Sequence, residues 1–258
     1  MRRELHAEWT KFRTAPGTGR LLLAVVALTA ALGAAAAATV SCRTAGCDYD
    51  VPKLSLMGVQ AGQAVVVILA VLAISGEYGT GMIRTTLAAM PRRASVLAAK
   101  AVVLTGVTLA AGTLAVLGSV LAGRLILPGN GFTPGNGFAP LSLADGPTLR
   151  AAAGSVLYLA LVALLSLGVA VAVRDSATSI GVVFGLLYVL SVLPVMVSDP
   201  GWQVLLWRIS PMNAGLAVQA TTHLSVLPLS PWAGLGVLAA WAGAALLGGG
   251  LLLRLRDA

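Results

Sequence analysis

Nine acidic residues and two histidines are the side chains of this sequence that could move a proton or hold a metal ion. The acidic residues are Glu4, Glu8, Asp48, Asp50, Glu77, Asp145, Asp175, Asp199 and Asp257. All of them lie in the tails, in loops or at the ends of long apolar runs. A carrier that couples to protons or sodium usually needs an ionisable group at membrane depth, where a charge costs about 2.5–3.5 kcal/mol or more. The sequence therefore disfavours ion-coupled transport, and it offers no pair of side chains for general acid–base catalysis.

Patterns that bind phosphate or metal are also missing from the sequence. No Gly-rich loop is followed by Lys and Ser or Thr, so the chain cannot bind ATP in the P-loop manner. The histidines, His6 and His223, fall on opposite sides of the membrane in the topology derived below, too far apart to share a metal ion. We expect no catalytic site, no metal site and no bound cofactor, and any ATPase has to be a separate polypeptide.

The two cysteines, Cys42 and Cys47, fall in the first external loop, with Gly46 between them. An oxidising compartment would permit a disulfide across this short turn. Two free thiols without a role are the alternative. We favour the disulfide on the ground of the compartment alone.

The chain is too apolar for a water-soluble domain. Hydrophobic residues make up 58% of it, charged residues only 10%, and the mean hydropathy is +0.92, whereas about 25% of an ordinary soluble domain is charged. A helix needs about 20 apolar residues to cross the hydrocarbon core. Uncharged stretches of that length run over residues 21–40, 54–76, 101–123, 151–173, 177–197 and 232–253. They lack the alternating pattern of a barrel strand, so we predict an all-α polytopic membrane protein with these stretches as its transmembrane helices.

Lysine and arginine are shared unequally between the two sides of this topology. The side opposite the N-terminus receives Arg43, Lys53, Arg124, Arg150 and Arg208, and the other 12 of the 17 basic residues fall with the N-terminus. The positive-inside rule therefore places both termini in the cytoplasm. A basic region and an apolar run of about 20 residues each are too long for a cleaved signal peptide. The basic residues form no stripe with interleaved aromatics, so we expect anionic membrane lipid, and not nucleic acid, as their partner.

Neither a repeat of fixed period nor a linker divides the chain, so residues 1–258 are predicted to form a single transmembrane domain. Gly58 with Gly62, and Gly181 with Gly185, have the spacing that lets helix backbones approach closely. Packing within one chain and contact with a second copy are both open interpretations of these pairs.

The loop between the second and third spans, residues 77–96, has the pattern of a short amphipathic helix. Thr80 is a plausible N-cap, and Pro91 would help to end the helix. Apolar residues recur at i, i+4 and i+7, namely Ile83, Leu87 and Met90. Such a helix would lie at the interface with its arginines toward the cytosol. An ordinary positive-inside loop is the alternative interpretation.

This loop resembles the signature that ABC-2 type permeases carry after their second span: a Glu, an aromatic, a Gly-Thr pair, an Arg, a Leu and a Pro-Arg. The matching residues are Glu77, Tyr78, Gly79, Thr80, Arg84, Leu87, Pro91 and Arg92. In that family the loop is a coupling helix that inserts into a groove of the partner ATPase. The resemblance implies that Glu77 and Arg84 make that contact or brace it. The Gly-Thr-Gly run leaves the first turn of this helix in question.

The first 20 residues resemble the connecting helix of the same family, which lies at the membrane interface. Its members often begin with an acidic residue, an aromatic and a Lys-x-Arg cluster, matched here by Glu8, Trp9, Lys11, Phe12 and Arg13. Leu5, Trp9 and Phe12 would share one apolar helical face. A basic tail that only anchors the chain to lipid is the alternative.

Residues 198–231, between the fifth and sixth spans, are too apolar for a solvated loop. Trp202 and Trp207 lie between Pro200 and Pro211, and tryptophans favour the membrane interface. We predict an external interfacial segment with a short helix at the outer membrane surface. The family has comparable external helices at this place.

The chain is thus similar to the permease subunit of a bacterial ABC-2 type exporter, a multi-pass protein of the inner membrane with the ABC-2 type exporter fold. The resemblance implies a second permease copy or a sister permease, and a separate P-loop ABC ATPase that binds the ATP. Spans two and five would line the path. Gln60 and Gln63 are the polar exceptions on otherwise apolar faces, so the expected cargo is an amphiphilic or apolar small molecule, peptide or lipid.

Other classes of function stay open. A membrane anchor or sensor that partners a signalling protein is poorly distinguished by the sequence. An ion-coupled secondary transporter is disfavoured because the spans carry no charge. A membrane-embedded enzyme would need a catalytic pair that the sequence does not offer.

Overall fold

The computed structural model describes residues 2–15, 17–42, 47–79, 81 and 93–255, without the side chains of 2, 3 and 93. Within these ranges the chain is helical, with no strand, and holds six helices long and apolar enough to cross a membrane. The spans are α2 (Thr18–Thr39), α4 (Val59–Gly79), α6 (Arg93–Ile126), α7 (Gly146–Val173), a fifth helical run (Ser176–Met196) and α12 (Pro231–Leu255). The prediction of an all-helical chain is thus confirmed for the described residues, and so is the prediction of six apolar helices long enough to cross a membrane.

Several helices begin at an acidic residue that caps them. Asp145 accepts a hydrogen bond from the Thr148 amide at the start of α7, and Asp175 accepts one from the Thr178 amide at the start of α8 (Ser176–Phe184). Asp50 caps α3 (Val51–Ser55), and Asp199 caps α10 (Pro200–Ile209), in the same way. A side-chain cap satisfies an amide that the first helical turn leaves without a partner. These acidic residues at the span boundaries therefore define where the helices begin.

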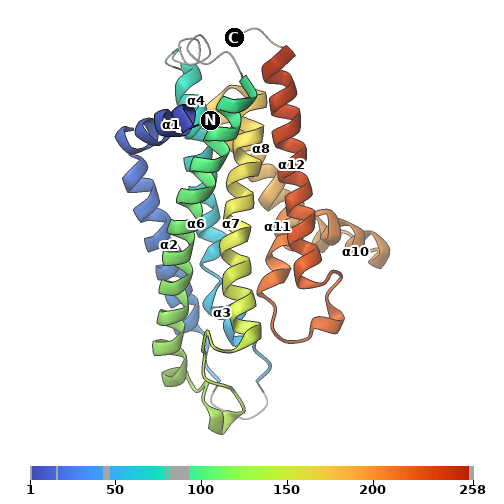
Figure 1. Ribbon diagram of the computed structural model, residues 1–258. Coiled ribbons are helices and arrows are strands. Elements are labelled where there is room, and N and C mark those ends of the chain that lie inside the picture. The colour runs from blue at the N-terminus through green and yellow to red at the C-terminus, as the bar shows by residue number, and fades with distance from the viewer. Residues whose placement is uncertain (1, 16, 43–46, 80, 82–92, 256–258) are drawn as a thin grey trace.

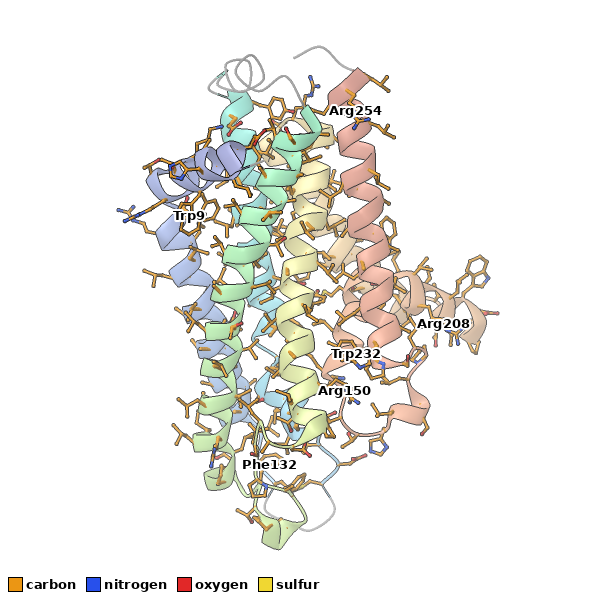
Figure 2. All side chains as sticks on the ribbon, in the orientation of Figure 1. Trp9, Phe132, Arg150, Arg208, Trp232 and Arg254 are labelled. Carbon is orange, nitrogen blue, oxygen red and sulfur yellow. A yellow bond between two sulfur atoms is a disulfide. The ribbon has the colours of Figure 1, made fainter. Side chains whose placement is uncertain are left out.

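The bundle is built around α7. This helix packs against α12, α6, α4 and α8, and α2 packs on the other side against α6 and α4. Figure 1 shows α1 (Arg2–Thr14) and the last residues of α12 at one end of the bundle. We call this end the terminal face and the opposite end the far face. Figure 2 places Arg254 at the terminal face, and Phe132 and Arg150 toward the far face.

The two glycine pairs have opposite environments. A Cβ atom on Gly58 would lie 1.9 Å from the carbonyl oxygen of Thr29, and one on Gly62 would lie 2.0 Å from Thr29 Oγ1. This pair therefore lets α4 approach α2 within the chain. No heavy atom lies within 4 Å of a Cβ built on Gly181 or Gly185, so that pair faces away from the described bundle.

The fifth span is not a regular helix. A π-helical turn, Gly185–Val189, separates α8 from α9 (Leu190–Met196), and Pro194 lies inside α9. Figure 1 shows α10 projecting sideways from the bundle, and none of its residues is buried. Extra residues in a helical turn and an internal proline both interrupt the hydrogen-bond ladder of a helix.

The segment 198–231 differs in part from an interfacial segment. It contains the predicted exposed helix, α10, but also α11 (Pro211–Leu216), most of which is buried. Small residues explain the burial, because a Cβ on Gly234 of α12 would lie 1.9 Å from the Ala214 carbonyl oxygen. Residues after Ser210 therefore start a packed helix, which Ser210 caps through the Asn213 amide.

Candidate functional site

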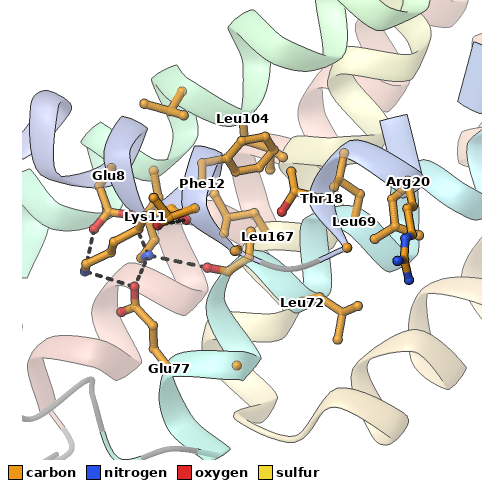
Figure 3. Close-up of a pocket in the computed structure, with 18 residues that line it drawn as sticks. Glu8, Lys11, Phe12, Thr18, Arg20, Leu69, Leu72, Glu77, Leu104 and Leu167 are labelled. Atoms are coloured by element: carbon orange, nitrogen blue, oxygen red, sulfur yellow. Dashed lines mark hydrogen bonds and ion pairs between the residues drawn. The ribbon is translucent and has the colours of Figure 1, made fainter. Parts of the chain in front are cut away.

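Four charged side chains meet at the terminal face and form an ion cluster, defined here as Glu8, Lys11, Glu77 and Lys100 (Figure 3). Lys100 Nζ lies 2.6 Å from Glu8 Oε2 and 2.6 Å from Glu77 Oε1. Lys11 Nζ lies 3.1 Å from Glu8 Oε1 and 3.0 Å from Glu77 Oε1. Each ammonium group therefore touches both carboxylates, and the charges alternate around the cluster.

The ion cluster is buried. The side chains of Lys100, Glu8 and Glu77 are 4%, 5% and 7% exposed, whereas Lys11 is 30% exposed. A charge in such a place persists only when it is paired and hydrogen-bonded. Two carboxylates and two ammonium groups balance here, and Lys100 also lies 3.4 Å from the Ala73 carbonyl oxygen. Removing one member would leave an uncompensated charge in a nearly dry site.

Lys11 is the member of the ion cluster nearest to solvent. Partial burial works against its charged form, but hydrogen bonds and Coulomb attraction from Glu77 and from Glu8 outweigh the burial. The pKa of Lys11 is therefore raised above its ordinary value. The ammonium form stays in place throughout the physiological pH range.

Three elements supply the ion cluster. Glu8 and Lys11 stand one helical turn apart on α1, Glu77 is in the last turn of α4, and Lys100 is about two turns into α6. The last two residues flank the loop 77–96 in the sequence. The cluster therefore joins the helix before the first span to both flanks of that loop.

The structure places the predicted coupling residues unequally. Glu77 is buried in the ion cluster, Tyr78 is half-buried with the Arg174 guanidinium 5.5 Å from its ring centre, and Gly79 is exposed. Thr80, Arg84, Leu87, Pro91 and Arg92 lie outside the described residues. Glu77 is thus buried among described side chains and does not lie on an open surface in this conformation.

The predicted connecting helix divides into two faces. Residues Arg2–Thr14 form the helix α1, with Glu8 buried and Phe12 packed against the core. Arg13 is exposed, and Trp9 is 48% exposed and lies beside the spans in Figure 2. The face that carries Glu8, Lys11 and Phe12 is therefore the one that docks on the bundle.

Lys100 is the member that sequence reasoning missed. By sequence it is only one of the basic residues on the side of the N-terminus, just outside the predicted third span. The signal available was its position: Glu77 ends one apolar run and Lys100 begins the next one along the chain. Opposite charges at the adjacent ends of two antiparallel helices can pair across them.

A cavity of about 810 Å³ lies next to the ion cluster, beneath α1 and the start of α2. The cluster residues and Arg20 supply its charged lining, as Figure 3 shows. Its apolar lining includes Leu21, Leu69, Leu72, Val103, Leu104 and Leu167. The cavity is therefore amphiphilic, with charges along one part of its wall.

A second polar group lies deeper in the bundle. Tyr158 of α7 donates a hydrogen bond to Gln63 Oε1, and Gln63 Nε2 lies 3.3 Å from Met212 Sδ. Tyr188 of the π-helical turn donates to the Gln60 carbonyl oxygen at 2.7 Å. Gln63 is fully buried, so it does not face an open path along spans two and five in this structure. Its partners explain why an amide is stable there.

The far face is held by a disulfide and by Asp50. Cys42 and Cys47 are joined in a disulfide, with their Cα atoms 6.0 Å apart. Asp50 accepts hydrogen bonds from the Thr221 amide at 2.6 Å and from Thr221 Oγ1 at 2.7 Å. The hydrogen bonds of Asp50 tie the loop after the first span to the loop before the last one.

Comparison with known proteins gives the chain no family. No protein-family model matches it, and no curated protein matches its sequence. The function has to be argued from the helical architecture and from the ion cluster.

Proposed function

We propose that this protein is the membrane-spanning subunit of an ATP-driven ABC-2 type exporter in the bacterial inner membrane, with both termini in the cytoplasm. The ion cluster is the observation that carries the proposal. A permease without its own ATP site needs a mechanical connection from a cytoplasmic loop to its spans. The ion cluster supplies such a connection, because it fixes α1, the end of α4 and the start of α6 to one another.

The connection would work through the burial of its charges. Separating a buried ion pair exposes uncompensated charges and costs about 3–5 kcal/mol. A force on the loop 77–96 therefore moves α1, α4 and α6 together. In this scheme an ATPase that closes on ATP pushes that loop, and the spans shift between inward and outward access as rigid bodies. Arg84 and the rest of the predicted coupling helix would make the contact with the ATPase.

The remaining parts of the proposal rest on the resemblance to ABC-2 type permeases and on the apolar composition of the spans. The exporter contains a second permease copy or a sister permease and two ATPase subunits, which bind the ATP. The apolar faces of the spans suit an amphiphilic or apolar cargo, such as a drug, an antibiotic, a peptide or a lipid. The permease itself catalyses no reaction, and it needs no cofactor.

The test is purification of the tagged chain from its native membrane in a mild detergent, with identification of the chains that co-purify. We expect a stoichiometric P-loop ATPase, and reduced retention of it in an Arg84→Ala variant. Lys100→Met should keep the ATPase bound, because Lys100 is buried, but should uncouple ATP hydrolysis from the permease in lipid nanodiscs. Arg254→Gln, at the same end of the bundle (Figure 2), is the matched control and should change neither property.

Other outcomes would favour the alternatives. Absence of any ATPase, under conditions that preserve other membrane complexes, would favour a membrane anchor or sensor. Transport that survives ATP depletion and depends on a proton or sodium gradient would favour a secondary transporter. Wild-type coupling in Lys100→Met would show that the ion cluster does not transmit the motion.

A further inference from the structure

The cavity beneath α1 holds one cation that the ion cluster does not balance. Glu8, Lys11, Glu77 and Lys100 cancel one another, whereas Arg20 lines the same cavity, is exposed, and forms no ion pair with any described residue. Figure 3 shows the Arg20 side chain at the opposite side of the cavity from Glu8. The lining therefore carries a net positive charge at the Arg20 end.

The start of α2 adds to this charge. Gly17 occupies its N-cap position with a φ of 104° and gives no side-chain hydrogen bond to the first turn. The Thr18 amide donates to the Ala15 carbonyl oxygen at 3.4 Å, and the helix dipole favours an anion near this end of α2. Gly17, Thr18 and Arg20 all line the cavity, so the uncapped turn and the guanidinium face one space.

The other walls suit a hydrocarbon chain. Leu72 lines the cavity and is 44% exposed, although it lies inside a membrane span. Gly76, one turn further along α4, has no heavy atom of the described residues within 4 Å of the position of a Cβ. The volume of about 810 Å³ falls within the roughly 300–1,000 Å³ of small-molecule sites. An apolar wall that is left uncovered beside an unbalanced cation fits an amphiphile with an anionic head.

We propose that this cavity binds one acidic phospholipid from the leaflet on the terminal side. The phosphate lies against Arg20 and the first turn of α2, and an acyl chain covers Leu72 and the space beside Gly76. The position is the right one for a lipid, because the ends of the spans lie at the level of the headgroups and Trp9 of α1 flanks them. The net charge of the headgroup gives the preference for acidic over zwitterionic lipid, because a zwitterionic headgroup brings its own cation close to the positively charged Arg20. This proposal does not depend on an ATPase partner.

The experiment is native mass spectrometry of the detergent-purified chain, titrated with phosphatidylglycerol and, separately, with phosphatidylcholine of the same acyl chains. We expect one phosphatidylglycerol per chain, bound at least about tenfold more tightly than phosphatidylcholine. Arg20→Gln should abolish the preference for phosphatidylglycerol. Gly76→Leu should weaken both lipids by about tenfold or more, because its side chain occupies the acyl space.

Two matched variants serve as controls. Arg254→Gln removes an exposed arginine at the same end of the bundle, and Gly181→Leu adds the same side chain at another open glycine that does not line the cavity. Both should bind as the wild type does. Equal binding of the two lipids to the wild type would overturn the proposal, as would variants that behave like their controls. Should Gly76→Leu fail to fold, Arg20→Gln decides alone, because Arg20 is exposed and its replacement disturbs no described packing.

Discussion

Lys100 Nζ lies 2.6 Å from Glu77 Oε1, although 23 positions separate the two residues and the loop 77–96 lies between them. The contact joins the ends of α4 and α6 that lie at the terminal face. Glu8 and Lys11 then complete the ion cluster from α1. One buried contact between two spans thus becomes the docking site of a third helix.

Because charges alternate around the ion cluster, mutations of its members should have non-additive effects on the free energy of unfolding. Lys100→Met leaves two buried carboxylates against the single ammonium of Lys11, so we expect a loss of roughly 3–5 kcal/mol in the free energy of unfolding. Glu77→Gln with Lys100→Met leaves Glu8 paired with Lys11, and the double variant should lose less than Lys100→Met alone. The free energies of unfolding of the single and double variants are measured in the same detergent. If the double variant lost as much stability as the two single variants together, the cluster would not be coupled. Lys100→Arg keeps the charge and serves as the control.

The hydrogen bond of Tyr158 to Gln63 predicts a second stability effect. Tyr158→Phe removes a donor from a fully buried amide oxygen, and an unsatisfied buried group costs about 1–3 kcal/mol. Tyr188→Phe is the matched control, because its hydroxyl bonds the backbone of Gln60, which is exposed. We expect a clearly lower melting temperature for Tyr158→Phe and a smaller change for Tyr188→Phe. Equal changes in melting temperature for the two variants would mean that the burial of Gln63 does not determine the loss of stability.

The disulfide leads to one prediction about the stability of the protein and one about the side of the membrane on which its loop lies. The sequence separation of Cys42 and Cys47 is 5, and closing a loop this short stabilises by roughly 2 kcal/mol on the chain-entropy model. A reductant should lower the melting temperature of the wild type but not that of Cys42→Ala with Cys47→Ala. After reduction in intact cells, a membrane-impermeant maleimide should label the thiols if the loop is external. Labelling only after the membrane is broken would reverse the proposed orientation.

How far the sequence predicts this structure depends on the range of the interaction. Span positions follow from hydropathy, a local property, and the structure has six helices of the required length. The helical form of residues 2–14 likewise follows from local spacing. The ion cluster could not be predicted as a whole, because it depends on how α1 folds back over α4 and α6.

Polar residues show the same division. Asp50, Asp145, Asp175 and Asp199 each cap a helix by bonding an amide three residues further on, a local relation that a sequence can indicate. The burial of Gln63 depends on Tyr158, which is 95 positions away. Burial of α11 depends on its contact with Gly234 of α12. Such contacts are set by the packing of distant helices, so periodicity carries no signal for them.

The pair of His223 and Asp48 predicts a pH dependence at the far face. Their side chains lie 2.9 Å apart, and the hydrogen bond and the charge of Asp48 raise the pKa of His223, with a smaller contribution from Asp50. A group whose pKa is raised in the folded state adds stability that is fully present below its unfolded pKa, about 6.5 for histidine. This added stability is lost as the pH rises through the folded pKa. The wild type should therefore melt above His223→Gln at pH 5.5 and level with it at pH 9.

The effect is expected to be small, because both side chains are exposed. Asp48→Asn should remove the same pH dependence while keeping His223. Lys53 and Asp50 line the same pocket. A melting difference that grows toward pH 9 would have the wrong sign for this pair.

The two glycine pairs, Gly58 with Gly62 and Gly181 with Gly185, predict opposite effects of alanine substitution on the melting temperature. Gly58→Ala places a Cβ 1.9 Å from the backbone oxygen of Thr29, and overpacking of this kind costs about 1–3 kcal/mol or more. Gly181→Ala meets no heavy atom within 4 Å and gains helix propensity, up to roughly 1 kcal/mol. Melting temperatures of the two variants should therefore move in opposite directions. Gly181→Ala could instead lower the melting temperature as Gly58→Ala does. Gly181 would then have to pack against a neighbour outside the described residues. A loss of oligomer on size exclusion would identify a second copy of the chain as that neighbour.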